Sequence, residues 1–78
     1  MESISAKDLL NIIQELSPKY KVVFNLYAIE GYTHQDISEK LGISVGTSKS
    51  NLSRARQILQ DKVNKLYNTE PHKLKVVR

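Results

Sequence analysis

The stretch THQDISEKLGISVGTSKSNLSRAR, residues 33–56, decides the fold that this sequence predicts. Thr33 can cap a short helix over residues 34–40, because Asp36 stands three positions on and completes a capping box. Gly42 then supplies a tight turn, and a second, longer helix follows. Two helices joined by so short a turn are typical of a helix-turn-helix, whose second helix lies in the major groove of DNA.

Two further helices are predicted before this pair. Ser5 and Pro18 mark their starts, over residues 6–16 and 18–29, because serine is a good N-cap and proline fits the first helical position. The second helix of the pair is predicted to continue over residues 45–67. The expected architecture is therefore all-α, a four-helix helix-turn-helix domain of the winged-helix-like type without a sheet.

The apolar residues predict which faces of these helices are buried. The first helix has an apolar face made of Leu9, Leu10, Ile12, Ile13 and Leu16. The second helix carries apolar residues on more than one stripe, so we expect it to be central and covered on two sides. Ser17 is expected to cap this helix and Gly31 to end it. Ser38 should lie where the paired helices approach closely.

Length and composition limit the classes of protein that fit. The 78 residues suffice for one domain, which we expect to span residues 5–67. Residues 68–78 contain Pro71 and no helical pattern, so a basic and mostly disordered tail is predicted there. The sequence has no cysteine for disulfides. No apolar run approaches the ~20 residues that span a bilayer and no signal peptide is recognisable, so a cytoplasmic location without membrane contact is expected.

Basic residues are concentrated in the second half of the chain. Residues 1–43 carry four basic and six acidic side chains, whereas residues 44–78 carry eight basic and two acidic ones, a net charge of +6. Such a surplus attracts polyanions by long-range Coulomb forces. Charge alone does not distinguish nucleic acid from an acidic membrane surface as the binding partner. The choice between these two partners therefore depends on the predicted helix-turn-helix.

The periodicity of the last predicted helix separates a core face from a free face. At about 100° per residue, one stripe falls together and should face the core; it comprises Val45, Ser48, Leu52, Ala55, Leu59, Val63 and Leu66. The opposite side and its flanks are small, polar and basic near the N-terminus of the helix. Such a face fits a major groove, where arginine can bond a guanine edge twice and asparagine can do the same for adenine.

Several short pieces of sequence stand in a distinctive order along residues 5–67. They are Leu16-Ser17-Pro18, Val23-Phe24, Glu30-Gly31-Tyr32, Ile37, Leu41-Gly42-Ile43, Val45-Gly46-Thr47 and Ser53-Arg54-Ala55-Arg56. No piece is specific alone, but together they resemble region 4 of the sigma-70 family of RNA polymerase sigma factors. The closest resemblance is to the extracytoplasmic-function type.

The resemblance implies sequence-specific binding of double-stranded DNA at the −35 promoter element, which directs transcription initiation. It also implies contact with the flap of the RNA polymerase β subunit and makes an anti-sigma factor a further candidate partner. By position in the motif, the residues that would face bases and the nearest phosphates are Lys49, Ser50, Ser53 and Arg54. Those that would chiefly contact phosphates are Thr47, Arg56 and the backbone N–H groups of Ser44 and Val45. Helical periodicity adds Asn51 to the predicted DNA-binding surface.

The chain also departs from the family's pattern. Many relatives have arginine at the position of Lys49 and more bulk or charge at Asn51 and Ser53. Lysine carries a point charge and discriminates guanine less well than arginine, whose guanidinium can form two hydrogen bonds to one base. The base preference of a relative therefore cannot be assigned to this chain. A complete sigma factor also needs region 2, so the chain is expected to be either an excised domain or a stand-alone relative.

Two alternatives remain open at this point. The DNA-binding domain of a LuxR-type response regulator shares the four-helix plan, but it usually has a threonine-arginine-glutamate turn where this chain reads Ser17-Pro18-Lys19-Tyr20. A sigma-like module that acts mainly through protein partners, an anti-sigma factor or the β flap, would use apolar residues such as Ile58 and Tyr67.

Enzyme activity is not expected, because the carboxylates are scattered over predicted helix surfaces. His34 and His72 are far apart in the sequence and have no convincing ligand set, so no metal site is predicted. There is no glycine-rich phosphate loop and no cofactor is expected. Tyr27 is expected to pack between helices.

Overall fold

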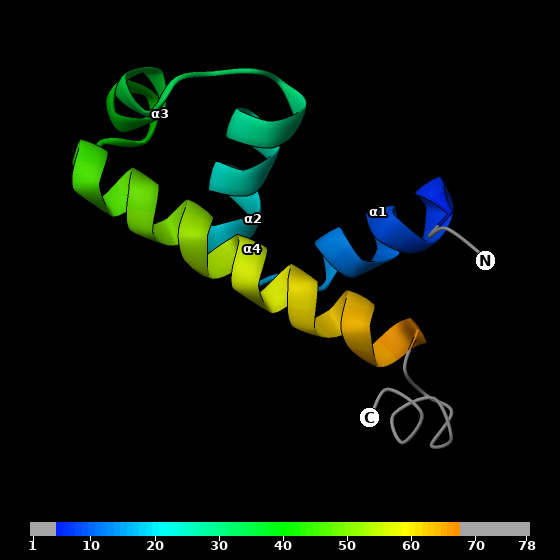
Figure 1. Ribbon diagram of the computed structural model, residues 1–78. Coiled ribbons are helices and arrows are strands. Elements are labelled where there is room, and N and C mark those ends of the chain that lie inside the picture. Colours follow the sequence, from blue (N-terminus) through cyan, green and yellow to red (C-terminus); the bar gives the residue numbers. More distant parts are fainter. Residues whose placement is uncertain (1–4, 68–78) are drawn as a thin grey trace.

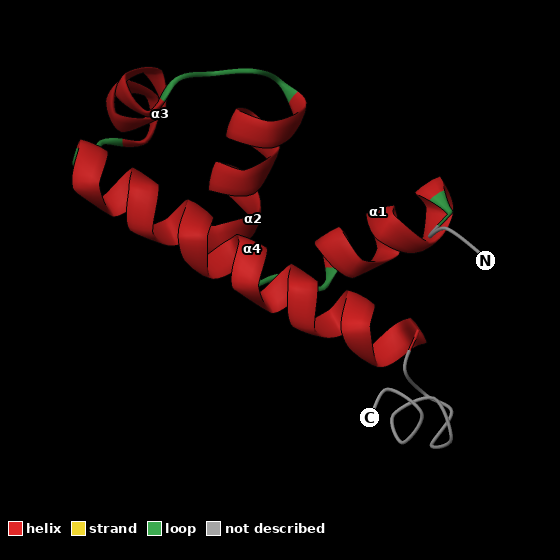
Figure 2. Cartoon of the chain, viewed as in Figure 1, coloured by secondary structure: helices red, strands yellow, loops and turns green. Residues whose placement is uncertain are grey.

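The computed structural model describes residues 5–67 and consists of helices joined by short connections (Figures 1 and 2). The elements are α1 (Ala6–Gln14), α2 (Pro18–Phe24), the π-helical turn η1 (Asn25–Ile29), α3 (His34–Leu41) and α4 (Val45–Tyr67). No strand occurs within residues 5–67, so the all-α expectation is confirmed. The predicted tail, residues 68–78, lies outside the described residues, as does the side chain of Tyr67.

Helix α4 is the element against which the others pack. In Figure 1 it runs the length of the molecule, with α3 beside its N-terminal end and α1 beside its C-terminal half. Helix α2 crosses near its middle and continues directly into η1. No helix within residues 5–67 is long and apolar enough to cross a membrane. The second helix of the helix-turn-helix is thus also the central helix against which the rest of the described domain packs.

The core consists of two clusters of buried side chains placed along α4. The first joins α1 to the middle and C-terminal half of α4 and contains Ile12, Ile13, Leu16, Ala55 and Leu59. The second joins α2, α3 and the N-terminal half of α4 and contains Val23, Ile37 and Leu52. Phe24 packs against both clusters and connects them. The stripe predicted for α4 is therefore buried along most of its length, including Ser48, which has no exposed surface.

Local hydrogen bonds fix the turn between α3 and α4. Thr33 Oγ1 accepts from the backbone N–H of Asp36 at 3.0 Å, and Asp36 Oδ2 accepts from the N–H of Thr33 at 3.2 Å, so the predicted capping box is present. Gly42 ends α3 in the left-handed conformation with φ +69°, which glycine adopts without strain. The Ser38 hydroxyl donates to the Ile43 carbonyl and fastens the turn to α3.

Helix α1 is shorter than the predicted range of residues 6–16. It ends at Gln14, and the N–H groups of Glu15 and Leu16 turn back to carbonyls three residues earlier. The reason is Pro18, which restricts the residue before it to an extended backbone; Ser17 has φ −64° and ψ 155°. The expected Ser17 side-chain cap is absent, although its carbonyl accepts from the first turn of α2.

Several apolar side chains that periodicity placed on buried faces are in fact exposed. Leu10 is 54% exposed, Leu66 43% and Leu9 37%, because no described element packs over these ends of α1 and α4. Val22 and Ile29 are also exposed, although Phe24 of the same segment packs against both core clusters. The expected burial of these residues was wrong, whereas Ile12, Ile13 and Leu16 are buried.

The helix predicted over residues 18–29 has the expected extent but changes pitch within it. In η1 the N–H of Glu30 donates to the carbonyl of Asn25, five residues back, at 3.0 Å. Gly31 then adopts φ +80° and ends the segment, as predicted, and the N–H of Tyr32 closes the turn onto the Leu26 carbonyl at 2.9 Å. The wider turn changes the direction of the side chains that follow Phe24.

Candidate nucleic-acid interface

The first turn of α4 is organised by its own side chains. Ser44 Oγ accepts from the backbone N–H of Thr47 at 2.9 Å and so caps the start of α4. The same hydroxyl donates to Thr47 Oγ1, also at 2.9 Å. Both side chains are exposed and lie at the positive end of the helix dipole, where an anion is favoured.

Most residues predicted to contact DNA lie on the free surface of α4. Exposed side chains are Ser44, Thr47, Lys49, Ser50, Ser53, Arg54 and Arg56, while Asn51 is half-buried. On the opposite side of the same turns, Ser48, Leu52 and Ala55 are buried. The first acidic residue of α4 is Asp61, so the cations of its N-terminal half have no acidic neighbour along the helix. This half of α4 is thus anchored by its core side and presents a polar, basic face to solvent.

The two arginines of this helix point to different flanks. Residues two positions apart on an α-helix point about 160° away from each other. Arg54 lies on the outer side, where its Nη1 donates to Gln57 Oε1 at 3.2 Å. Arg56 turns toward η1, and its guanidinium carbon lies 5.8 Å from the centroid of the Tyr27 ring. The predicted set is therefore brought together along one half of α4, but Arg56 lies at its edge.

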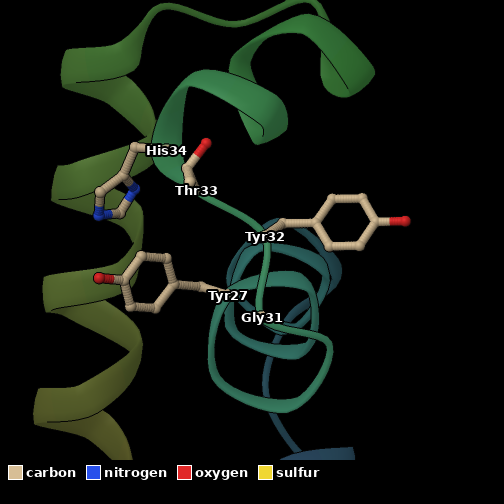
Figure 3. Close-up of a pocket in the computed structure, with 5 residues that line it drawn as sticks. All are labelled: Tyr27, Gly31, Tyr32, Thr33 and His34. Carbon is tan, nitrogen blue, oxygen red and sulfur yellow. The ribbon is translucent and has the colours of Figure 1, made fainter.

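A cluster that sequence reasoning did not identify lies beside Arg56. The rings of Tyr27 and His34 are stacked, with centroids 4.5 Å apart and planes at 19°. His34 Nδ1 lies 2.9 Å from Ser48 Oγ, which ties the first residue of α3 to the buried stripe of α4. Figure 3 shows both rings pointing toward α4, while Tyr32 points to the opposite side of the segment. Tyr27, Tyr32 and His34 line an open pocket together with Gly31 and Thr33.

Little in the sequence could have identified this cluster. Tyr27 and His34 lie in different predicted helices, and their spacing carries no periodic signal. The expectation that Tyr27 packs between helices agrees with its contacts, since it packs against the core cluster of α2, α3 and α4. Ile58, considered above for a partner surface, is half-buried and packs against the cluster of α1.

Fold and surface together define a helix-turn-helix domain whose second helix presents a basic face. The family described as "Sigma-70, region 4" matches residues 6–59. This match covers more than half of the chain, so the chain belongs to the sigma-70 region 4 family. The expected resemblance is confirmed, and the LuxR-type alternative is not favoured. Because this family is a non-enzymatic transcription-factor domain, membership also agrees with the expectation that the chain is not an enzyme.

Two relatives carry informative names. The chain is 35% identical over 54 residues to "ECF RNA polymerase sigma factor SigE" of Mycolicibacterium smegmatis, a match that covers 69% of this chain and 21% of the relative. It is 31% identical over 58 residues to "ECF RNA polymerase sigma-E factor" of Haemophilus influenzae, which covers 74% of this chain and 31% of the relative. The chain thus spans less than a third of the length of these relatives. None of the solved structures matches it significantly.

Proposed function

We propose that this chain binds double-stranded DNA at the −35 promoter element, as region 4 of an ECF-type RNA polymerase sigma factor, and so helps to direct transcription initiation in the cytoplasm. The observation that carries this proposal is the exposed polar and basic face on the N-terminal half of α4. The capping box and the Gly42 turn hold this face outward. Membership of the sigma-70 region 4 family supports the same function.

The geometry suggests distinct roles within this face. Lys49, Ser50, Ser53 and Arg54 are proposed to face base edges and the nearest phosphates. Among residues 5–67 the side chain of Arg54 bonds only to the exposed amide of Gln57, so exchanging this bond for one to a guanine edge costs little. The small side chains on the same face let the helix backbone approach the bases.

Phosphate contacts are proposed for the rim of the face. Ser44, Thr47 and the N–H groups of the first turn lie at the positive end of α4, where a phosphate is stabilised. Asn51 and Arg56 lie on opposite flanks of the helix, and each is proposed to contact the strand on its own side. Together these contacts would fix the register of α4 in the groove, while the central residues read the sequence.

The first experiment selects bound duplexes from a random library at low salt and then measures affinity for the selected duplex by fluorescence anisotropy across a salt series. Phosphate-mediated binding should weaken with salt, with log K falling by about 0.9 per contact for each log unit of salt concentration.

Two matched variants remove the same charge at the two ends of α4. Lys49→Ala/Arg54→Ala should abolish selective binding, whereas Lys62→Ala/Lys65→Ala should leave it nearly intact. A chain with no affinity even at low salt would contradict the proposal.

A second proposed partner is the flap of the RNA polymerase β subunit. The observation that favours it is an apolar groove on α2 and η1, lined by Pro18, Lys21, Val22, Asn25, Leu26 and Glu30. Val22 lines this groove and is exposed. Titration of an isolated flap fragment should give binding that Val22→Asp abolishes while DNA affinity is retained. Flap binding without any DNA affinity would favour the module that acts mainly through protein partners.

A further inference from the structure

We infer that Tyr27 is a positioning residue for Arg56: its ring, braced by His34, holds the Arg56 guanidinium at the edge of the DNA-facing surface of α4. The functional part of this inference rests on the proposed phosphate contact of Arg56. The positioning itself rests on contacts between three elements, η1, α3 and α4. Neither periodicity nor family membership assigns Tyr27 this role.

The first step is the contact between cation and ring. The guanidinium carbon of Arg56 lies 5.8 Å from the Tyr27 centroid, inside the ~6 Å range of a cation–π interaction. Within residues 5–67 the only ion pair joins Glu15 and Lys62, at the other end of α4. No carboxylate of the described part therefore competes with the Tyr27 ring for Arg56, and its N–H groups stay available to a phosphate.

The second step is the immobilisation of the ring. Tyr27 is half-buried and stacks on His34 with centroids 4.5 Å apart. His34 Nδ1 in turn lies 2.9 Å from Ser48 Oγ, and Ser48 is completely buried. Tyr27 thus packs against the core cluster of α2, α3 and α4 and is also held by the first residue of α3. The Tyr27 ring is a fixed surface and not a mobile side chain that follows Arg56.

The third step connects positioning to affinity. A free arginine side chain loses rotamer freedom when it contacts a phosphate, and this loss weakens binding. A guanidinium that already lies over a fixed ring has lost much of that freedom and keeps its planar donors for the phosphate. The contribution should be about the strength of an exposed cation–π contact, or about two- to five-fold in affinity.

A double-mutant cycle on the selected duplex tests the coupling. Tyr27→Leu keeps apolar volume but removes the ring, and it should weaken binding about two- to five-fold. Tyr27→Phe keeps the ring and is the matched control, with affinity near wild type. In an Arg56→Ala background, Tyr27→Leu should have no further effect. An equal loss in both backgrounds, or none in the wild-type background, would overturn the inference. Circular dichroism and thermal unfolding check that each variant folds.

A second measurement tests the positioning without DNA. In the free protein, the ring current of Tyr27 should shift the NMR signals of the Arg56 side-chain protons, a shift kept in Tyr27→Phe and lost in Tyr27→Leu. If the shift is present and no duplex binds, the proposed function fails while the positioning stands. If the wild type shows no ring-dependent shift, the positioning fails even when DNA binds.

Discussion

The two halves of α4 are held in the fold by different kinds of contact. Around the N-terminal half, Leu52 packs in an apolar cluster with Val23 and Ile37, and the polar contact between His34 and Ser48 adds a directional link to α3. Around the C-terminal half, α1 packs through apolar side chains. An exposed ion pair also links the end of α1 to the C-terminal half of α4, with 3.2 Å between Glu15 Oε1 and Lys62 Nζ.

The two ends of the domain therefore differ in how narrowly their geometry is specified. Apolar contacts tolerate small shifts, because attraction depends on area more than on direction. Hydrogen bonds of buried groups require particular distances and angles, so they specify one arrangement. The half of α4 proposed to read DNA is therefore the half in which a directional bond to α3 adds to apolar packing.

The largest expected effect comes from the centre of the helix-turn-helix cluster. Ile37 is completely buried, so Ile37→Ala should destabilise the domain by about 2–5 kcal/mol. That is a large part of the ~4–12 kcal/mol available to a chain of this size. Leu10→Ala, at a side chain 54% exposed on α1, should cost less than about 1 kcal/mol. Urea unfolding followed by circular dichroism measures both, and equal costs would contradict the expectation that the cluster around Ile37 contributes more to stability than the exposed end of α1.

The next effect concerns DNA affinity. Arg54→Ala should weaken binding to the selected duplex by about 1–3 kcal/mol and relax one base preference. Lys65→Ala removes the same charge at the other end of α4 and should cost less than about 0.5 kcal/mol. Anisotropy titrations at one stated salt concentration compare the two variants. If Arg54→Ala binds as tightly as wild type, α4 is not the recognition helix.

A pair of glycines distinguishes turn geometry from helix propensity. Gly42 has φ +69°, so Gly42→Ala should destabilise the domain by about 1–2 kcal/mol through backbone strain. Gly46 lies within α4, and an added Cβ would meet only Ser44 Oγ at 3.8 Å, an ordinary contact. Gly46→Ala should therefore stabilise the domain by about 0.5–1 kcal/mol. Thermal unfolding of both variants checks the opposite signs, and a shift of the same sign would contradict this explanation of the turn.

The smallest effect is expected at the contact between α1 and the end of α4. Glu15→Gln removes one partner of the exposed ion pair with Lys62 and should cost less than about 1 kcal/mol. The loss should shrink further when salt is added, because the pair is open to solvent. Urea midpoints at low and high salt test this expectation. A larger, salt-insensitive loss would show that this half is also held by directional contacts.

The elements that the sequence predicted correctly are those set by local chemistry. Thr33 and Asp36 lie three residues apart and bond each other across one helical turn. Gly42 was predicted for the turn because few other residues adopt a positive φ. Ser48 was placed on the core stripe by periodicity alone, and it is buried. In each case the information lies within a few residues of the chain.

The features that were missed depend on which elements meet. Periodicity placed Leu10 on the same face as Ile13, but it could not tell that only Ile13 is covered by α4. The stacking of Tyr27 on His34 depends on the path of the chain between η1 and α3. That path follows a π-helical turn, which ordinary helical periodicity does not anticipate. The DNA contacts of individual residues stay predictions.

The π-helical turn makes the length of one segment as important as its composition. Such a turn is equivalent to one extra residue inserted into an α-helix. A deletion of one residue within Asn25–Ile29 would restore an ordinary helical pitch and leave α2 in nearly the same orientation relative to Gly31, because this wider turn sweeps about the same angle with one residue more. Relatives that lack one residue here should therefore keep the arrangement of the helices but differ in which side chain of this segment lies beneath the residue at the position of Arg56.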